Sequence, residues 1–360
     1  MGQKQRRRNA FKRTNGLGFF AGNDQRASLS KLGDPLERLN ACIDWETFRE
    51  PLAVVYGRED KVAVGRPPID AVLMLRILIL QRLYNLSDDQ TEYQIRDRAS
   101  FQRFLDLHVE DGSADAKTIW KFRERIKDAN LERDLFFRFD AHLRAQGLTA
   151  KGGQIIDATI IEAPRQRNTR GENEQIKEGE MPAEWDDQRN KIAQKDCDAR
   201  WTKKHGQTYF GYKNHINVDA EHKLIRDYTV TDAAVHDSQV FDDLVEMEPG
   251  ERAVYADSAY RSEQCEAMLA AANVPSRIHE RAYTNAPLSE AQKAANREKS
   301  RVRVRVEHVF GFVRTSMNGG GVVRTIGSMR AQVVIALSNL TYNLARFAQI
   351  VLPRRRPAAA

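Results

Sequence analysis

Apolar residues recur at three- and four-residue spacing from about residue 35 to 147, a pattern that predicts an all-helical region with few strands. The segment 69–83 is apolar on nearly every side, and Pro67 with Pro68 marks its start. We therefore expect it to be the buried central helix of this region. Its apolar run, residues 71–80, is interrupted by Arg76 and is too short to span a bilayer, so we expect no membrane segment.

After residue 150 the pattern changes to short β-branched and apolar runs, which are typical of strands. We expect the strands at 151–163, 207–219, 223–233, 252–260 and 274–278. The segments 235–245, with Asp237 or Ser238 as its cap, and 262–272 read as helices. This order of elements is typical of a mixed sheet covered by helices on both faces. Between the first two strands about forty polar residues, 165–204, predict a long, partly disordered loop.

Residues 301–312, RVRVRVEHVFGF, allow two interpretations. Strict alternation of Arg and Val predicts a strand whose exposed face carries Glu307 among arginines. Helical spacing instead gives one buried stripe, formed by Val302, Val306, Val309 and Val313. We favour the helix, because the valine stripe continues beyond the alternation. A second stripe then presents Glu307 between Arg303 and Arg314.

Positive charge is clustered along a chain with 57 Lys and Arg against 50 Asp and Glu. Residues 1–13 hold six basic and no acidic side chains, 293–314 hold seven against two, and 353–357 read PRRRP. Such clusters suit a polyphosphate partner, although a solvated surface explains any single cluster equally well. A helix that begins after Ser113 or Asp115 carries Lys121 and Arg123. It fits a DNA groove, or equally a surface helix with Trp120 and Phe122 packed inward.

Other cofactors and compartments have little support in the sequence. Cys42, Cys197 and Cys265 are far apart, which disfavours a zinc site or a disulfide. The glycines 319–321 match no phosphate-binding loop, so we expect no nucleotide cofactor. The basic N-terminus lacks the apolar core of a secretory signal, and we expect a cytoplasmic protein.

Two carboxylates lie in otherwise apolar strand segments, Asp157 in QIIDATII and Asp257 in AVYADSAY. A buried, ionised carboxylate is costly unless it is paired, hydrogen-bonded or bound to a metal ion. Each aspartate alone is explained as well by capping of backbone amides. If the two strands are neighbours, the carboxylates converge and require a cation, for which Mg²⁺ or Mn²⁺ is suited.

A set of ordered motifs resembles the DDE transposases of the IS5 group of bacterial insertion sequences. The motifs are IIDATIIEA, YFGYKNHINVD, DAAVHDSQVFDDLV, YADSAYRS, VEHVFGFVR and RTIGSMRAQVVIALSNLTYNLAR. The segments 65–97 and 115–126 are similar to the helical N-terminal domain of that family. The resemblance implies an α/β fold in which an all-helical N-terminal domain precedes an RNase H-like catalytic core with a mixed sheet.

The resemblance also implies a catalytic and metal-binding triad, Asp157, Asp257 and Glu307, which holds two Mg²⁺ ions or Mn²⁺ in their place. The reaction implied is cleavage at the ends of the element, followed by transfer of the 3′-hydroxyl strand to target DNA. The expected partners are double-stranded DNA, both terminal inverted repeats and target, and a second copy of the chain. We expect the protein beside the bacterial nucleoid. A regulator that binds DNA without cutting it, or a nuclease without strand transfer, remains open.

Related transposases space Tyr, Arg, Glu and Lys along the glutamate helix. Here Arg303 occupies the Arg position, but Ser300 replaces the Tyr and Arg314 the Lys. Lys213 and His215 share one strand face with Tyr209, and Arg261 follows Asp257 closely. His236 and Asp237 are explained by capping as well as by catalysis. The candidates for DNA contact are Arg303, Arg314, Lys213, Arg301, Arg305, Arg261, Lys121 and Arg123.

The expected domain boundaries follow from these patterns. We expect a basic arm at 1–30, a helical domain for DNA binding and dimerisation at 31–148, a catalytic domain at 149–350 with a polar insertion at 165–205, and a basic tail at 351–360.

Overall fold

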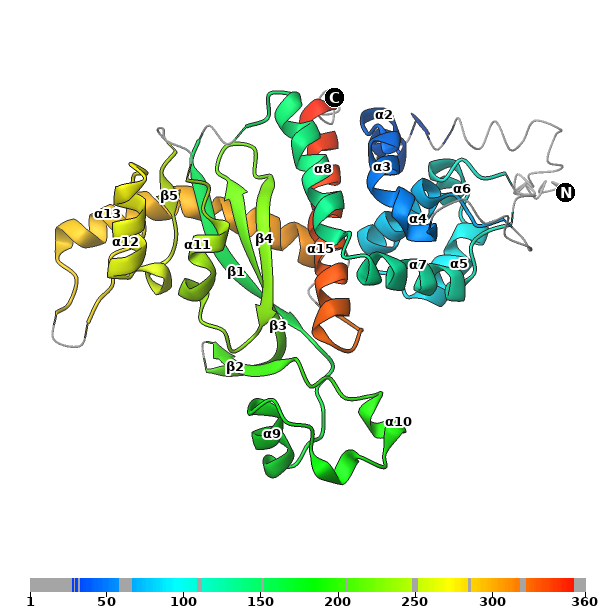
Figure 1. Ribbon diagram of the computed structural model, residues 1–360. Helices are drawn as coiled ribbons and strands as arrows, with labels where there is room; N and C mark the ends of the chain where they lie inside the picture. The colour runs from blue at the N-terminus through cyan, green and yellow to red at the C-terminus, as the bar shows by residue number, and fades with distance from the viewer. Residues whose placement is uncertain are drawn as a thin grey trace, which may run out of the picture.

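A helical N-terminal region and a curved mixed sheet covered by helices make up the computed structural model (Figure 1). The structure describes residues 28, 30–31, 33–57, 67–108, 112–149, 152–204, 206–247, 252–283, 286–317 and 322–352. The predicted fold class is confirmed: an RNase H-like α/β core follows an all-helical region. The basic N-terminal segment 1–13, the glycines 319–321 and the basic segment 353–357 lie outside the described residues.

The N-terminal helices pack around α4 (Ala71–Tyr84), which is buried on nearly all sides, as predicted. The Asp70 side chain caps α4 by accepting from the Leu73 N–H at 3.0 Å, and Asn85, with φ +50°, ends the helix. The surrounding elements are α2 (Pro35–Cys42), η1 (Trp45–Phe48), α3 (Arg49–Leu52), η2 (Ala53–Tyr56), α5 (Asp88–Asp97), α6 (Ala99–Phe104), α7 (Ala116–Asp128) and α8 (Glu132–Ala145).

Helix α7 begins at Asp115, one of the two predicted caps, which accepts from the Thr118 N–H. Phe122 is buried, but Trp120 is 43% exposed, so of the two residues that the surface-helix alternative packs inward only Phe122 does so. Arg123 fixes α7 to α5, because it forms two 2.8 Å contacts with Asp88 of that helix. Trp120 is therefore left on the exposed side of α7.

The sheet has the strand order of RNase H-like folds. Its strands are β1 (Gln154–Glu162), β2 (Arg200–Lys204), β3 (Gln207–Asp219), β4 (Ile225–Asp232) and β5 (Val254–Tyr255). β3 lies between β4 and β1 and is antiparallel to both, and the predicted hairpin of β3 and β4 is confirmed. β5 runs parallel to β1, and the segment 275–279 continues the sheet beyond β5. β2 was not predicted; it pairs antiparallel with the first residues of the long β3 and forms an edge of the sheet.

Helices cover the two faces of the sheet. On one face Ile155 shares a core with Val306 of α14 (Arg305–Gly311) and with α15 (Ser328–Val351). On the other, Ile156 packs with residues of α11 (Phe241–Leu244) and α12 (Glu263–Ala271). Side chains alternate along a strand, so Asp157 and Thr159 point to the α14 face. The remaining elements are η4 (Asp237–Val240), η5 (Ser258–Tyr260), α13 (Glu290–Arg303) and the π-helical segment η6 (Phe312–Ser316).

The polar insertion is folded, so the prediction of a long, partly disordered loop is wrong. It holds α9 (Arg170–Lys177), η3 (Ala183–Trp185) and α10 (Arg189–Ile192), which form a separate lobe below the sheet (Figure 1). A capping box of Thr169 and Glu172 begins α9. The fully buried Trp185 donates its indole N–H to Glu172 at 2.6 Å. One tryptophan thus supplies a small core that the polar composition conceals.

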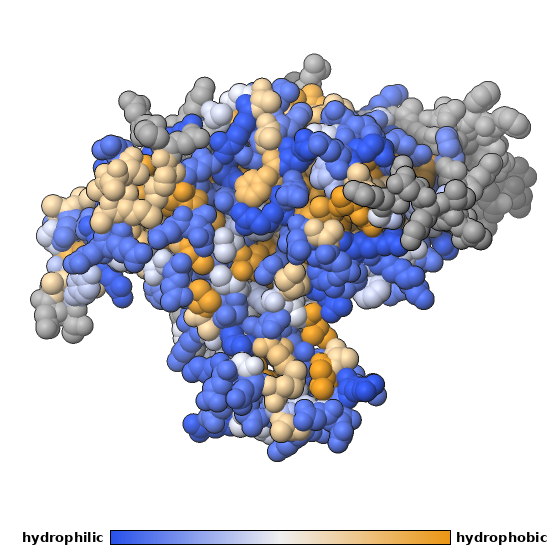
Figure 2. Space-filling model, in the orientation of Figure 1, coloured by the Kyte–Doolittle hydropathy of each residue, from blue (hydrophilic) through white to orange (hydrophobic). Residues whose placement is uncertain are grey.

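Helix α15 joins the two regions. It runs between the sheet and the N-terminal helices (Figure 1) and packs against α2, α4, α7, α8 and β4. Asn339 bonds Asn214 of β3 at 2.8 Å, and Asn343 bonds both backbone groups of Ile225. Among the described residues no helix is long and apolar enough to cross a membrane. On the face seen in Figure 2 the surface is mostly hydrophilic, with apolar residues in separate areas.

A buried ion network also joins the two regions. Arg226 of β4 is 1% exposed and reaches Asp140 of α8 at 2.9 Å and Asp219 of β3 at 3.0 Å. It also donates to the Leu148 carbonyl at the end of the α8 segment. The single guanidinium therefore pairs with two buried carboxylates from different regions, and Arg144 pairs with Asp140 as well.

We expect Arg226→Met to lower the free energy of unfolding by about 3–5 kcal/mol, because it leaves the buried Asp219 without its cation and Asp140 with Arg144 alone. The measurement is urea unfolding followed by circular dichroism. Arg138→Met is the control: this arginine pairs with Glu50 at the surface, and we expect a loss below about 1 kcal/mol. Equal losses in the two variants would contradict the role assigned to the buried network.

Candidate active site

Asp157 lies on β1, near the middle of the sheet, opposite Ile216 of β3. Its side chain is 15% exposed, and its Oδ2 accepts from Arg303 Nη1 at 2.7 Å. Burial raises the pKa of Asp157 to about 6; the Arg303 cation opposes this shift, and the charge of Asp257 adds to it. The carboxylate therefore lies in a place where a positive charge is needed.

Asp257 follows β5 and stands beside Asp157. The parallel register pairs Gln154 with Val254 and Ile155 with Tyr255, and two further residues along each strand bring the two aspartates level. One Asp257 oxygen accepts from the Ala259 N–H at 2.8 Å, which caps η5. The predicted convergence of the two strands is thus observed, and it explains why Asp257 acts on the pKa of Asp157.

The segment 301–312 is helical, as we favoured, with a break at Val304 between α13 and α14. Val306 and Val309 are buried against the sheet core, as the valine stripe requires. Glu307 remains 60% exposed, and its Oε1 is 3.9 Å from Arg303 Nη2. The strand interpretation is therefore excluded, and Glu307 faces the side of the sheet that carries Asp157.

Arg303 bridges the two carboxylates of Asp157 and Glu307. Within the ranges that the structure describes, no three His, Cys, Asp or Glu side chains form a ready metal site. The donor set nevertheless fits a hard divalent ion, because it consists of carboxylate oxygens and already holds a cationic group. The buried Arg303 Nε has no hydrogen-bond partner, so this side chain is not fully satisfied in its position.

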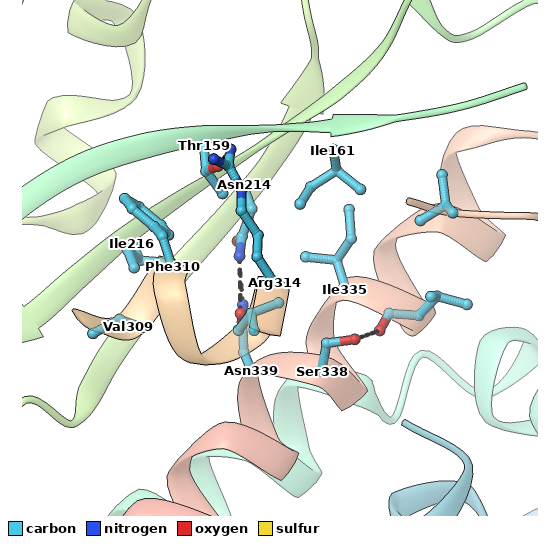
Figure 3. A pocket seen from close by; sticks show the side chains of 13 residues that line it. Thr159, Ile161, Asn214, Ile216, Val309, Phe310, Arg314, Ile335, Ser338 and Asn339 are labelled. Atoms are coloured by element: carbon cyan, nitrogen blue, oxygen red, sulfur yellow. Dashed lines mark hydrogen bonds between the residues drawn. The ribbon is translucent and has the colours of Figure 1, made fainter. Parts of the chain in front are cut away.

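Arg314 lies in the π-helical segment η6, where its Nη2 donates to Thr159 Oγ1 at 3.2 Å. Thr159 follows Asp157 on the same face of β1, so Arg314 lies beside the carboxylates. Figure 3 shows Arg314 reaching across a small cavity between β1, η6 and α15, with the Asn214–Asn339 pair at its base. This cavity of about 20 Å³ has room for about one water molecule and holds no larger ligand.

Lys213 and His215 lie on the opposite face of the sheet from Asp157, because they pair with Ile160 and Ala158. Lys213 Nζ bonds Asp237 at 2.8 Å and the Val235 carbonyl at 2.6 Å. His215 is fully buried, and its pKa falls to about 4, chiefly because of that burial. Both side chains thus have internal partners, and a DNA contact by Lys213 stays a prediction.

The cap of the helical segment after β4 differs from the prediction. His236 is the N-cap of η4, and its Nδ1 accepts from the Ser238 N–H at 3.3 Å. Asp237 and Ser238 are inside the turn, so the prediction that one of them caps it is wrong. Asp237 is instead held by its ion pair with Lys213.

The other predicted DNA contacts are spread over the molecule. Arg305 donates to the Ala220 carbonyl at 2.7 Å, and Arg261 pairs with Glu280 at 2.8 Å. Arg301 pairs with Glu298 and is 75% exposed, whereas Lys121 is exposed on α7. Of the predicted candidates, Arg303 and Arg314 are the two that hydrogen-bond side chains on the Asp157 face of β1.

His279 was missed by the sequence analysis. Its backbone N–H donates to the Ala256 carbonyl at 3.1 Å, next to Asp257, and its Nε2 is 3.3 Å from Ser300 Oγ. The sequence feature that could have pointed to His279 was the predicted strand at 274–278, because His279 is the residue that directly follows this strand. The pairing of that segment with β5 is non-local, so the sequence did not show that His279 reaches the site.

Two family models match the chain. Residues 24–125 match a transposase domain (DUF772), and residues 149–344, more than half of the chain, match the transposase DDE domain. The cryo-EM structure of the piggyBac transposase synaptic complex with hairpin DNA is similar over 88% of this chain and 75% of that chain. Its TM-score is 0.44 at 12% sequence identity. Asp157, Asp257 and Glu307 all lie within the DDE match.

We expect Asp157→Asn to change how stability depends on pH. The folded pKa of about 6 lies above the ordinary value of about 3.9, so between these values the folded protein holds a proton that the unfolded chain releases. Stability therefore falls as pH rises through this window, and the Asn variant lacks this part of the slope. Relative to wild type, the variant should be more stable at pH about 7 than at pH about 4 in urea unfolding. A difference that does not change with pH would contradict the burial of an ionisable Asp157.

Proposed function

The chain belongs to the family of DDE transposases, enzymes that act on DNA, and we propose that it cuts the ends of a bacterial insertion sequence of the IS5 group and transfers the freed 3′-hydroxyl strand to target DNA. We assign this chemistry to Asp157, Asp257 and Glu307. The observation that carries the assignment is the register of β1 and β5, which places two aspartates level on neighbouring strands. Arg303 lies within ion-pair distance of both Asp157 and Glu307, and so links the third carboxylate to the first.

The three carboxylates would hold two Mg²⁺ ions, with Mn²⁺ as a substitute. Such ions, when bound, favour the deprotonated form of the attacking water or hydroxyl and stabilise the leaving oxygen. The chain itself positions the reaction. The β1 and β5 backbones fix Asp157 and Asp257, and Arg303 and Arg314 present guanidinium groups that pair well with phosphate oxygens.

The proposed partners are the double-stranded ends of the element, the target DNA and a second copy of the chain, since two ends must be held together. We propose the boundaries 31–148 for a DNA-binding and dimerisation domain and 149–350 for the catalytic domain. The exposed Trp120 and Lys121 on α7 support a binding role for the first of these. The DDE match over 149–344 supports the second.

We expect Asp157→Asn, Asp257→Asn and Glu307→Gln each to lower the rate of metal-dependent cleavage by at least about a thousandfold, because each removes a charged oxygen ligand. The measurement is cleavage and joining of DNA that carries the element's ends, with Mg²⁺ or Mn²⁺. Glu174→Gln is the matched control: this exposed glutamate pairs with Arg170 on α9 of the separate insertion lobe, and its loss should leave the rate unchanged.

The products decide between the functions. Joined products support a transposase, unjoined breaks indicate a nuclease, and binding without cleavage indicates a regulator. Full cleavage by the Asp157→Asn variant would refute the assignment of the triad.

We expect Arg303→Gln to bind Mn²⁺ at least about tenfold more tightly than wild type in the absence of DNA, because the guanidinium competes with the ion for Asp157. Calorimetric titration gives the dissociation constant directly, without any assay of activity. Arg301→Gln removes the same charge from a side chain paired with Glu298, and it should bind as wild type does. Weaker Mn²⁺ binding by Arg303→Gln would show that Arg303 supports the ion site instead of competing for it.

A further inference from the structure

A groove of about 600 Å³ runs along α13 and ends at Glu307. Most of its ionisable lining residues are cationic or imidazole side chains, with Glu307 as the acidic one among the described residues. The lining comprises Lys293, Arg297, Arg301, Arg303, Glu307, His279, Asn296, Ser300, Leu288 and Val304. This charge distribution selects an anion, and the groove leads it to the carboxylates of the proposed active site.

Three of the cations form one row on α13. Lys293, Arg297 and Arg301 follow one another at four-residue spacing, which advances about 6 Å along a helix at each step and keeps them on one side. Lys293 and Arg301 have exposed partners, Glu290 and Glu298, at 2.8 and 2.7 Å. Exposed pairs of this kind are weak and screened by salt, so a phosphate can replace the carboxylate.

A second row of α13 is anchored and holds the first in place. Asn296 accepts from the Glu280 N–H at 2.8 Å and donates to the Glu280 carbonyl at 3.1 Å. Lys299 donates to the Ile278 carbonyl at 2.7 Å. The segment that receives these bonds pairs with β5, the strand that precedes Asp257. The cationic row is therefore fixed to the same framework as the catalytic carboxylates.

His279 and Ser300 meet where this groove approaches the active site. Their side chains are 3.3 Å apart, and the backbone of His279 is bonded next to Asp257. Ser300 stands one turn before Arg303 on α13. The groove thus changes from a cationic row to a pair of hydrogen-bonding groups as it nears Arg303 and Glu307.

We propose that this groove binds one strand of DNA, with Lys293, Arg297 and Arg301 on successive phosphates and His279 with Ser300 on the nucleotide nearest the cut. The proposal rests on the proposed function, because it names where that site takes its substrate strand. A groove of this size is comparable to a small-molecule pocket, and together with the cationic row it accommodates about three nucleotides of a single strand. Guanidinium groups favour phosphate oxygens through paired hydrogen bonds.

The test uses fluorescein-labelled DNA, a duplex of about 30 base pairs with or without a single-stranded tail of about ten nucleotides. Binding is measured by anisotropy over a range of salt concentrations. Lys293→Ala/Arg297→Ala should lower the slope of log Kd against log salt on the tailed duplex by about 1.4, or 0.7 for each lost contact with a single strand. Arg170→Ala/Lys177→Ala on α9 is the matched control: it removes two charges from a helix of the separate insertion lobe and should leave the slope unchanged.

A second measurement locates the contact on the strand. Methylphosphonates that neutralise the tail should weaken binding by wild type more than binding by the Lys293→Ala/Arg297→Ala variant, in which Arg301 is the one cation of the row that remains. His279→Ala should weaken binding of the tailed duplex without changing the salt slope, since its contact is not ionic. The proposal is overturned if the neutral tail weakens the double variant as much as wild type, or if the α9 control loses the same slope.

Different results would refute the DNA-binding role of the groove and the proposed function. Glu307→Gln should keep the full effect of the tail on binding while losing cleavage. A wild-type protein that shows the tail effect but never cuts DNA refutes the function and leaves the groove. A protein that cuts DNA but shows no tail effect refutes the groove alone. Unfolding temperatures equal to that of wild type establish that the variants are folded.

Discussion

A carboxylate buried on a central strand must have a cation within reach, and the architecture around Asp157 follows from this requirement. Its side chain points to the face that α13 and α14 cover, and Arg303 at the end of α13 supplies the charge. The helix breaks at Val304, directly after this arginine, and resumes so that Val306 and Val309 pack into the core. The ion pair and the buried valines thus fix one segment at two neighbouring points.

The same segment continues after α14 as a π-helix, which contains Arg314. An α-helical α14 of greater length would keep its residues in strict register, whereas the π-helical segment η6 shifts the residues that follow. Arg314 lies within η6 and contacts Thr159, the residue two positions after Asp157 on the strand. A second arginine is thereby held on the same face of β1 as the first. Backbone hydrogen bonding is less regular in a π-helical turn than in an α-helix, and such turns often occur at functional sites.

Local signals in the sequence were enough to predict some of these features. A single charge in an apolar strand identified Asp157 and Asp257, and the period of the valines distinguished helix from strand at 301–312. The fold of the insertion escaped prediction, because its stability comes from Trp185, which is buried by residues that are polar when taken singly. The exposure of Trp120 and the position of His279 depend on contacts between distant segments. Periodicity cannot report such contacts, since it describes only the faces of one element.

The position of α15 bears on the order in which the chain can fold during synthesis. The N-terminal helices emerge first, but a large part of their apolar surface is covered by this helix from the end of the chain. Asn343 of this helix also bonds both backbone groups of Ile225 in β4. While the nascent chain is incomplete, the helical region exposes the face that α15 later buries. A chain that stops before Ser328 therefore lacks the helix through which the two regions share one core.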